Sequence, residues 1–256
     1  MNQSTRSSQI QEELDYRVAI ADCFLDMSES CILKHAYDDA LKYVDLAVNL
    51  FNALNRDLSS VRVETNLRAI AKQLPKVNDR DKAHVEPDGS FHKPGCLHVL
   101  DEAHAFGGHT AMATRWIQLD GGDRIHSVVL LSQRSAPPVE LTRAVRESGG
   151  DIYTADQKSS LLEQAAWLRG LARKLATYVI LHIHPANSIA AVAFGNEGGP
   201  PVLLVNHSAH VFWVGASATD IVVNCRGSRL EEHWTRVHRG AKNCATIPSL
   251  FWNPNI

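Results

Sequence analysis

The spacing of hydrophobic residues along the chain changes near residue 85. Before that point apolar side chains recur every three or four positions, and residues 1–74 contain neither glycine nor proline. This spacing places the apolar side chains on one side of a helix and predicts an α-helical region over residues 1–74. The three apolar stripes are Ile10, Leu14, Val18, Ala21, Phe24 and Leu25; Ala40, Tyr43, Val44, Ala47, Leu50 and Phe51; and Leu58, Val61, Val63, Leu67 and Ile70.

The second stripe faintly resembles one helix of a tetratricopeptide repeat, but it occurs in a single copy. Because stacked repeats need about three copies for stability, we interpret residues 1–74 as a helical cap and not as a solenoid. Residues 75–95 then combine three prolines, two glycines and many charges, which predicts a linker.

From residue 96 to residue 256 short apolar runs alternate with amphipathic stretches. Buried strands separated by helices are typical of a parallel sheet that is covered on both faces, so we predict a Rossmann-like α/β domain. The expected strands are 96–100, 126–132, 151–155, 178–184 and 201–207, and the alternation continues through 210–215, 220–225, 228–238 and 243–250. The expected helices between them are 111–119, 137–149, 159–175 and 187–195.

Composition excludes several classes of protein. The net charge is −2 with no basic stripe, which argues against nucleic-acid binding. The five cysteines are scattered and form no C-x-x-C pair, so we expect neither a disulfide framework nor a structural zinc site. The polar start is unlike a signal peptide, and the longest apolar runs are far shorter than the roughly 20 residues that span a membrane. We therefore expect a cytoplasmic protein without a transmembrane segment.

Histidines gather where ligands bind in such folds. In open parallel sheets the ligand lies beyond the carboxyl ends of the strands, and several of the 13 histidines follow predicted strands. The candidates for contact with a ligand are Gly107, Gly108 and His109 after the first strand, His182 and His184 on the fourth, and His207 and His210 after the fifth.

Each candidate has a second interpretation. The turn at Gly107 and Gly108 either admits a phosphate to the following helix or is a tight packing turn. His182 and His184 are expected to point to the same side of their strand, as two metal ligands, as buried hydrogen-bonded rings or as substrate contacts. A third and fourth zinc ligand are not apparent, so no metal is predicted. His207 and His210 are either a proton-transfer group or solvated residues near a helix start.

Three stretches together resemble a known family. HVLDEAHAFGGHTAMATRWI, VILHIHP and VLLVNHSAHVFWVGASATDIVVNCRGSRLEEHW are similar to the amino-terminal domain of GT-B-fold glycosyltransferases, especially the retaining group called family 4 or group 1. The resemblance covers about residues 96–250. An acidic residue that often precedes the proline in the second motif is missing here.

The resemblance implies transfer of a sugar from a nucleotide-sugar donor to a glycan or lipid-linked acceptor hydroxyl, in glycan or cell-surface polysaccharide synthesis. It implies His184 and His210 as catalytic residues, with Gly107, Gly108, His109, His182 and His207 as substrate-binding residues. It also implies no cofactor and no metal, since amides and basic side chains balance the leaving diphosphate. Most of the donor site belongs to a second domain that residues 96–256 do not supply. We therefore expect this half to be incomplete as a catalyst and to need a donor domain, either from a longer gene product or from a separate chain.

Two other functions fit the same sequence. The chain could be a non-catalytic binding or scaffold subunit whose helical cap docks a partner. It could also be a nucleotide-sugar epimerase-like domain, which would act on the donor without an acceptor.

Overall fold

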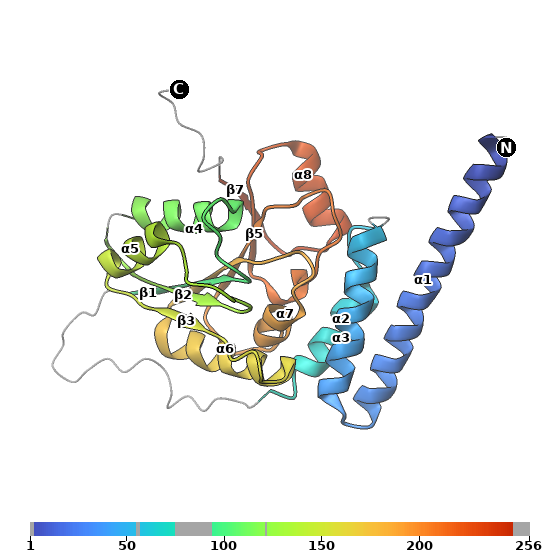
Figure 1. Ribbon diagram of the computed structural model, residues 1–256, viewed down its shortest axis with the longest axis horizontal. Coiled ribbons are helices and arrows are strands. Elements are labelled where there is room, and N and C mark those ends of the chain that lie inside the picture. Colours follow the sequence, from blue (N-terminus) through green and yellow to red (C-terminus); the bar gives the residue numbers. More distant parts are fainter. Residues whose placement is uncertain (1–2, 55–56, 75–93, 121, 248–256) are drawn as a thin grey trace.

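The computed structural model describes residues 3–54, 57–74, 94–120 and 122–247. Figure 1 shows a twisted sheet with helices on both faces and a group of three amino-terminal helices at one side. The structure confirms the predicted Rossmann-like α/β class. The proposed linker, apart from residues 94 and 95, lies outside the described residues.

The sheet contains seven strands, and all neighbouring strands run parallel. Their order is β3-β2-β1-β4-β5-β6-β7, so the winding direction reverses between β1 and β4. A ligand crevice in this type of fold forms at the carboxyl ends of the two strands that flank such a reversal. The strands are β1 (Gly95–Leu100), β2 (Ile125–Leu130), β3 (Ile152–Thr154), β4 (Tyr178–His182), β5 (Val202–Asn206), β6 (Ile221–Asn224) and β7 (Cys244–Thr246).

Helices cover the two faces of the sheet with different apolar clusters. On one face lie α4 (Gly108–Leu119) and α5 (Val139–Ser148), and on the other α6 (Leu161–Leu175) and α7 (Ser188–Phe194). Helix α6 begins with a capping box, in which Ser160 accepts from the Glu163 amide and the Glu163 carboxylate accepts from the Ser160 amide. The remaining elements are η2 (Ala216–Ala218), α8 (Arg229–His233) and a π-helical turn, η3 (Trp234–His238).

One expected element is absent, and one strand is shorter than expected. Residues 210–215 form a turn and an extended loop instead of continuing the alternation of strands and helices. The buried Arg239 stabilises this loop, because its guanidinium donates to the carbonyls of Ala209 and Val211 and lies over the Trp213 ring. Strand β4 ends at His182, two residues before the predicted end.

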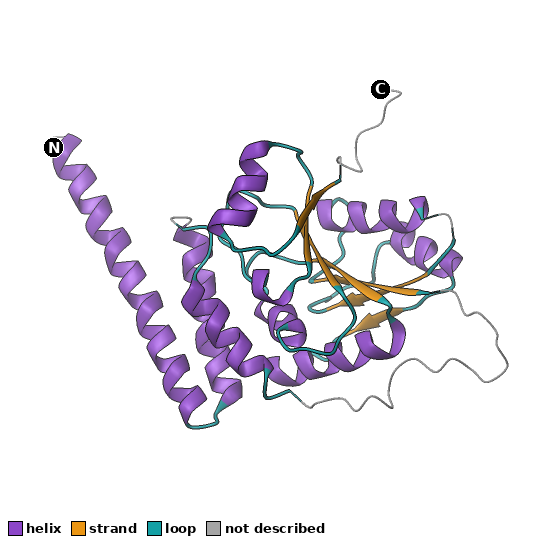
Figure 2. Ribbon diagram, turned by 180° about the vertical axis from the view of Figure 1, so that it is seen from behind, coloured by secondary structure: helices purple, strands orange, loops and turns teal. Residues whose placement is uncertain are grey.

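The amino-terminal helices are α1 (Gln3–Leu33), α2 (Tyr37–Leu54) and α3 (Val61–Ala71). Helices α2 and α3 pack against α6 and α7, and their apolar side chains belong to the same core as those of the sheet. The first half of α1 stands clear of the other elements in both views (Figure 1 and Figure 2), so Ile10 of the predicted stripe is exposed. Among the described residues, no helix has both the length and the apolar character needed to cross a bilayer.

A half-buried polar contact also joins the helical region to the loop and η2 turn that precede β6. The Glu64 carboxylate on α3 accepts hydrogen bonds from the amides of Gly215 (2.7 Å) and Ser217 (3.1 Å) and from the Ser217 hydroxyl. We expect Glu64→Gln to lower the free energy of unfolding by about 1–3 kcal/mol, because one of these donors would then face an amide NH₂. Urea unfolding of this variant checks the expectation, with the exposed Glu12→Gln as a matched control that should stay within about 0.5 kcal/mol of the wild type.

Candidate functional site at the carboxyl edge of the sheet

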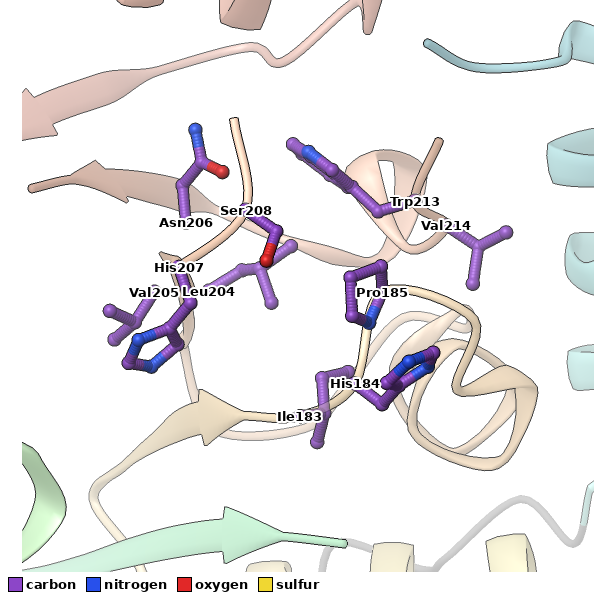
Figure 3. Close-up of a pocket in the computed structure, with 10 residues that line it drawn as sticks. All are labelled: Ile183, His184, Pro185, Leu204, Val205, Asn206, His207, Ser208, Trp213 and Val214. Carbon is purple, nitrogen blue, oxygen red and sulfur yellow. The ribbon is translucent and has the colours of Figure 1, made fainter. Parts of the chain in front are cut away.

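The loop that follows β4, the end of β5 and the segment that follows β5 enclose a small hollow at the carboxyl edge of the sheet. Its volume is about 20 Å³, enough for about one water molecule and well below the range for small-molecule sites. Figure 3 shows the loop after β4 on one side and the end of β5 on the other, with the His207 ring turned away from Trp213. The lining residues are Ile183, His184, Pro185, Leu204, Val205, Asn206, His207, Ser208, Trp213 and Val214.

Asp101 fixes the geometry of this edge. Its carboxylate, directly after β1, accepts hydrogen bonds from the His184 amide and from the side-chain amide of Asn187. Burial raises the pKa of Asp101, although these hydrogen bonds oppose the shift. Asn187 in turn caps α7, since its side-chain oxygen accepts from the Ala190 amide at 2.8 Å. Asp101 therefore joins the two strands at which the sheet order reverses.

The Gly107–Gly108 turn opens α4 beside that reversal. Gly107 is the N-cap residue, with an ordinary extended backbone (φ −86°, ψ 133°). A Cβ at Gly108 would meet no protein atom within 4 Å, and neither glycine has a positive φ. Protein packing thus gives no reason for glycine at position 108, which disfavours the tight-packing interpretation. The space over the first amides of α4 is open to a ligand.

His109 and His207 form a stacked pair next to this space. Their ring centroids are 4.1 Å apart with planes inclined by 30°. Burial lowers the pKa of His207 to about 3, and the neighbouring His109 contributes to the shift. Burial also lowers the pKa of His109, against the opposing charge of Asp101. Both rings are therefore neutral at pH 7, and each has one nitrogen that can accept a proton.

The two histidines expected to point to the same side of β4 are separated by the structure. His182 is the last residue of the strand and is fully buried, whereas His184 lies in the loop and is exposed. The prediction of one H-x-H strand pair is wrong because the hydrogen bond from the His184 amide to Asp101 draws the chain away from strand geometry. Nδ1 of His184 accepts from the Ala186 amide at 3.2 Å, which leaves Nε2 as its N–H.

The remaining candidates are placed as follows. His210 is exposed in the turn after β5, and no contact joins it to the other described candidates. Gly107, Gly108, His109 and His207 lie together. His182 contacts this group at two points, because its backbone hydrogen-bonds the His109 ring and its Nδ1 lies 3.4 Å from Nε2 of His207.

Sequence analysis missed a buried row of side chains that leads to His207. His98 lies between His182 and His126, at 3.1 Å from Nε2 of His182 and 3.0 Å from Nδ1 of His126. His126 then contacts a carboxylate oxygen of Asp120 at 3.0 Å. His98 and His126 stand inside predicted strands, and a histidine within a buried strand was the available signal.

Cys96 lies beside this row. Its sulfur is 3.6 Å from Nε2 of His98, and Cys96, His98 and His126 offer three potential metal-ligand atoms within 4.8 Å of one another. A structural zinc site uses four ligands, and burial raises the pKa of the Cys96 thiol to about 12. All ring nitrogens of His98 and His126 already face a partner in the row. The expectation that the chain holds no metal stays a prediction.

Comparisons with known proteins add little to this geometry. No protein-family model and no curated protein matches the chain. One similar solved structure is an O-GlcNAc transferase from Thermobaculum terrenum, a K341M mutant, with 12% identity and a TM-score of 0.37. The match covers 80% of this chain and 40% of that one, so the chain spans well under two thirds of its length.

Proposed function

We propose that this chain provides the acceptor-binding half of a glycosyltransferase of the GT-B type, which transfers a sugar from a nucleotide-sugar donor to an acceptor hydroxyl in glycan or polysaccharide synthesis. The observation that carries the proposal is the open, glycine-lined start of α4 beside the His109–His207 pair at the β1–β4 reversal. Ligands bind at this position in doubly wound sheets. The three motifs that resemble the GT-B family surround the same edge.

The residues at this edge suit the two demands of glycosyl transfer. An acceptor hydroxyl must lose a proton, and a neutral histidine such as His207 can accept one, with the imidazole of His184 as a second candidate. A leaving diphosphate must be balanced, and the free amides at the start of α4 favour an anion. In this proposal a second, donor-binding domain supplies most contacts to the nucleotide and completes the catalyst, and no metal is needed.

The family resemblance names His184 and His210 as catalytic residues, and both remain proposals. The geometry supports His207 as a third candidate, because it stacks on His109 and also lines the hollow. Asp101 is excluded from proton transfer in this proposal, since both of its oxygens already bind the loop after β4.

A single substitution at Gly108 tests the proposal. Gly108→Val fills the space over the first turn of α4 without meeting protein atoms near its Cβ, so we expect folding to persist. The probes are a panel of UDP- and GDP-sugars and simple glycans, titrated against protein carrying ¹⁵N-histidine. We expect at least one probe to shift the His109 and His207 signals saturably, and Gly108→Val to weaken that binding at least tenfold.

The matched control is Gly199→Val, at another glycine whose Cβ would meet nothing within 4 Å and which lies outside this edge. It should bind the probe as the wild type does. The proposal fails if no sugar or nucleotide sugar shifts either histidine, or if Gly108→Val binds as tightly as the control.

A further inference from the structure

A hydrogen-bonded row of four buried or half-buried histidines crosses the face of the sheet beneath α4. It runs from Asp120 through His126, His98 and His182 to His207, with successive nitrogen-to-acceptor distances of 3.0, 3.0, 3.1 and 3.4 Å. The row therefore connects the carboxyl end of α4, where Asp120 is the C-cap residue, with the candidate site at the opposite end of the sheet.

Strand register explains how the row forms. His126 pairs in register with Cys96, which is two residues before His98 on β1, and His182 pairs with Leu100, which is two residues after it. Each step to the next strand thus advances by two residues, which keeps the side chains on one face of the pleated sheet. The row lies between two separate apolar clusters, one that includes Leu100 and Val128 and another that includes Cys96 and Ile180.

The ionisation of Asp120 determines which nitrogen donates and which accepts in each hydrogen bond of the row. Burial opposes its ionisation, but the hydrogen bonds from Arg124 and His126 outweigh that effect and hold the pKa of Asp120 below its ordinary value. An ionised carboxylate can only accept, so Nε2 of His126 must carry the proton that faces it. In the inferred row the ring of His126 carries that proton alone, so its Nδ1 is an acceptor.

The same reasoning fixes each following ring. Nδ1 of His126 accepts from Nε2 of His98, Nδ1 of His98 accepts from Nε2 of His182, and Nδ1 of His182 accepts from Nε2 of His207. Burial lowers the pKa of His98 to about 3 and lowers that of His182 well below the ordinary value, so these rings are neutral. Trp116 packs edge-on against His98 and His182 and restrains ring rotation.

The tautomer of His207 follows by elimination. Its Nε2 is the donor to His182, so Nδ1 carries the lone pair. Nδ1 of His207 has no hydrogen-bond partner among the described residues and is not one of their buried unpartnered atoms. The atom is thus free to accept a proton from a ligand.

We infer that Asp120 is a positioning residue which, through three buried histidines, holds His207 in the Nε2–H tautomer, and that the row is a proton relay serving Nδ1 of His207. The tautomers do not depend on the proposed function, whereas the use of His207 as the base for an acceptor hydroxyl rests on it. The relay would serve a ligand whose hydroxyl group must be deprotonated.

The proton balance of the relay is simple. When Nδ1 of His207 gains a proton from a ligand hydroxyl, Nε2 of His207 releases its own proton to Nδ1 of His182. The same exchange at His182, His98 and His126 delivers one proton to the Asp120 carboxylate. The ligand loses one proton and Asp120 gains one, while every ring ends neutral in its other tautomer. The reverse sequence of transfers returns the proton to a leaving group. It restores the original tautomer of every ring, and no imidazole has to rotate.

Nuclear magnetic resonance of the free protein with ¹⁵N-histidine tests the inference. Wild-type protein at neutral pH should show His126, His98, His182 and His207 as single Nε2–H tautomers. Asp120→Asn should produce Nδ1–H or mixed tautomers along the row as far as His207, because an amide can donate as well as accept. Asp120→Glu, which keeps the carboxylate, should restore the Nε2–H form at His207.

Arg124→Gln is the matched control, because it removes the 2.7 Å ion pair with Asp120 but leaves the carboxylate in place. Its tautomers should equal those of the wild type. The inference is overturned if any of the four wild-type rings is Nδ1–H, if Asp120→Asn leaves His207 unchanged, or if Zn²⁺ binds tightly at Cys96, His98 and His126. The wild-type spectrum decides even if Asp120→Asn does not fold.

Sugar titration separates this inference from the proposed function. If the four rings show the predicted tautomers but no sugar shifts their signals, the inferred row stands and the glycosyltransferase proposal fails. Sugar binding at a His207 ring in the Nδ1–H form would retain the site and reject the relay.

Discussion

The protein loses stability steeply as the pH falls below about 6.5, the ordinary pKa of histidine. His98 and His182 are fully buried, and burial lowers the pKa of each in the folded state, to about 3 for His98. Below pH 6.5 these histidines are therefore protonated in the unfolded chain but not in the folded chain. Each such ring contributes stability that is complete above pH 6.5 and is lost progressively as the pH falls toward its folded pKa.

The expected loss is large for so small a change in pH. At pH 5.5 each fully buried ring lowers the free energy of unfolding by about 1.4 kcal/mol relative to neutral pH. His98 and His182 together therefore lower it by about 3 kcal/mol, and the half-buried His207 lowers it by a smaller amount. This is a substantial part of the 5–15 kcal/mol by which domains are usually stable. Asp45 and Asp101, whose pKa values burial raises, act in the opposite direction at more acid pH.

Urea unfolding between pH 7.5 and pH 5.5 measures this effect. The variant His210→Gln is the control, because His210 is exposed and should leave the pH dependence unchanged. A free energy of unfolding that stays flat across this range would show that the row is protonated in the folded protein, and would contradict the neutral rings on which the tautomer argument depends.

Gly150→Ala prevents the protein from folding, or costs about 5 kcal/mol or more. A Cβ at position 150 would lie 2.0 Å from the carbonyl oxygen of His126 and 2.5 Å from its carbonyl carbon. Both are backbone atoms of β2, which is paired on both sides, so they cannot move away without breaking the sheet. Losses of this size belong to steric conflicts in the core.

Gly170→Ala is the matched control for that substitution. Gly170 lies within α6, is exposed, and would meet nothing within 4 Å of an added Cβ. Alanine is the better helix former there, so we expect a gain of about 1 kcal/mol. Thermal unfolding of both variants measures the difference, and a folded Gly150→Ala protein with wild-type stability would show that β2 does not approach Gly150 so closely.

The spacing of apolar residues and the residue types typical of turns were sufficient to predict most of the fold. The strand from 221 to 224 and the helix from 161 to 175 lie within the predicted stretches because their apolar residues face a continuous core. The loop at 210–215 could not be predicted, because its apolar residues resemble a strand and only the distant Arg239 shows why they form none. Likewise the early end of β4 depends on Asp101, 83 positions away from His184.

The candidate site was predicted in part. Gly107, Gly108, His109 and His207 were found because they follow strands, and the reversal between β1 and β4 brings their elements together. His98, His126 and Asp120 were missed, since their proximity depends on the register of three strands, which local sequence does not encode.

The most direct test of the account is a crystal structure of the protein with the sugar or nucleotide sugar that binds it most tightly. We predict density over Gly108, with a ligand hydroxyl within hydrogen-bond distance of Nδ1 of His207. A ligand bound instead in the cavity of about 210 Å³ lined by Arg169, Gly198 and Asp220 would contradict both the placement of the site and the role of the histidine row.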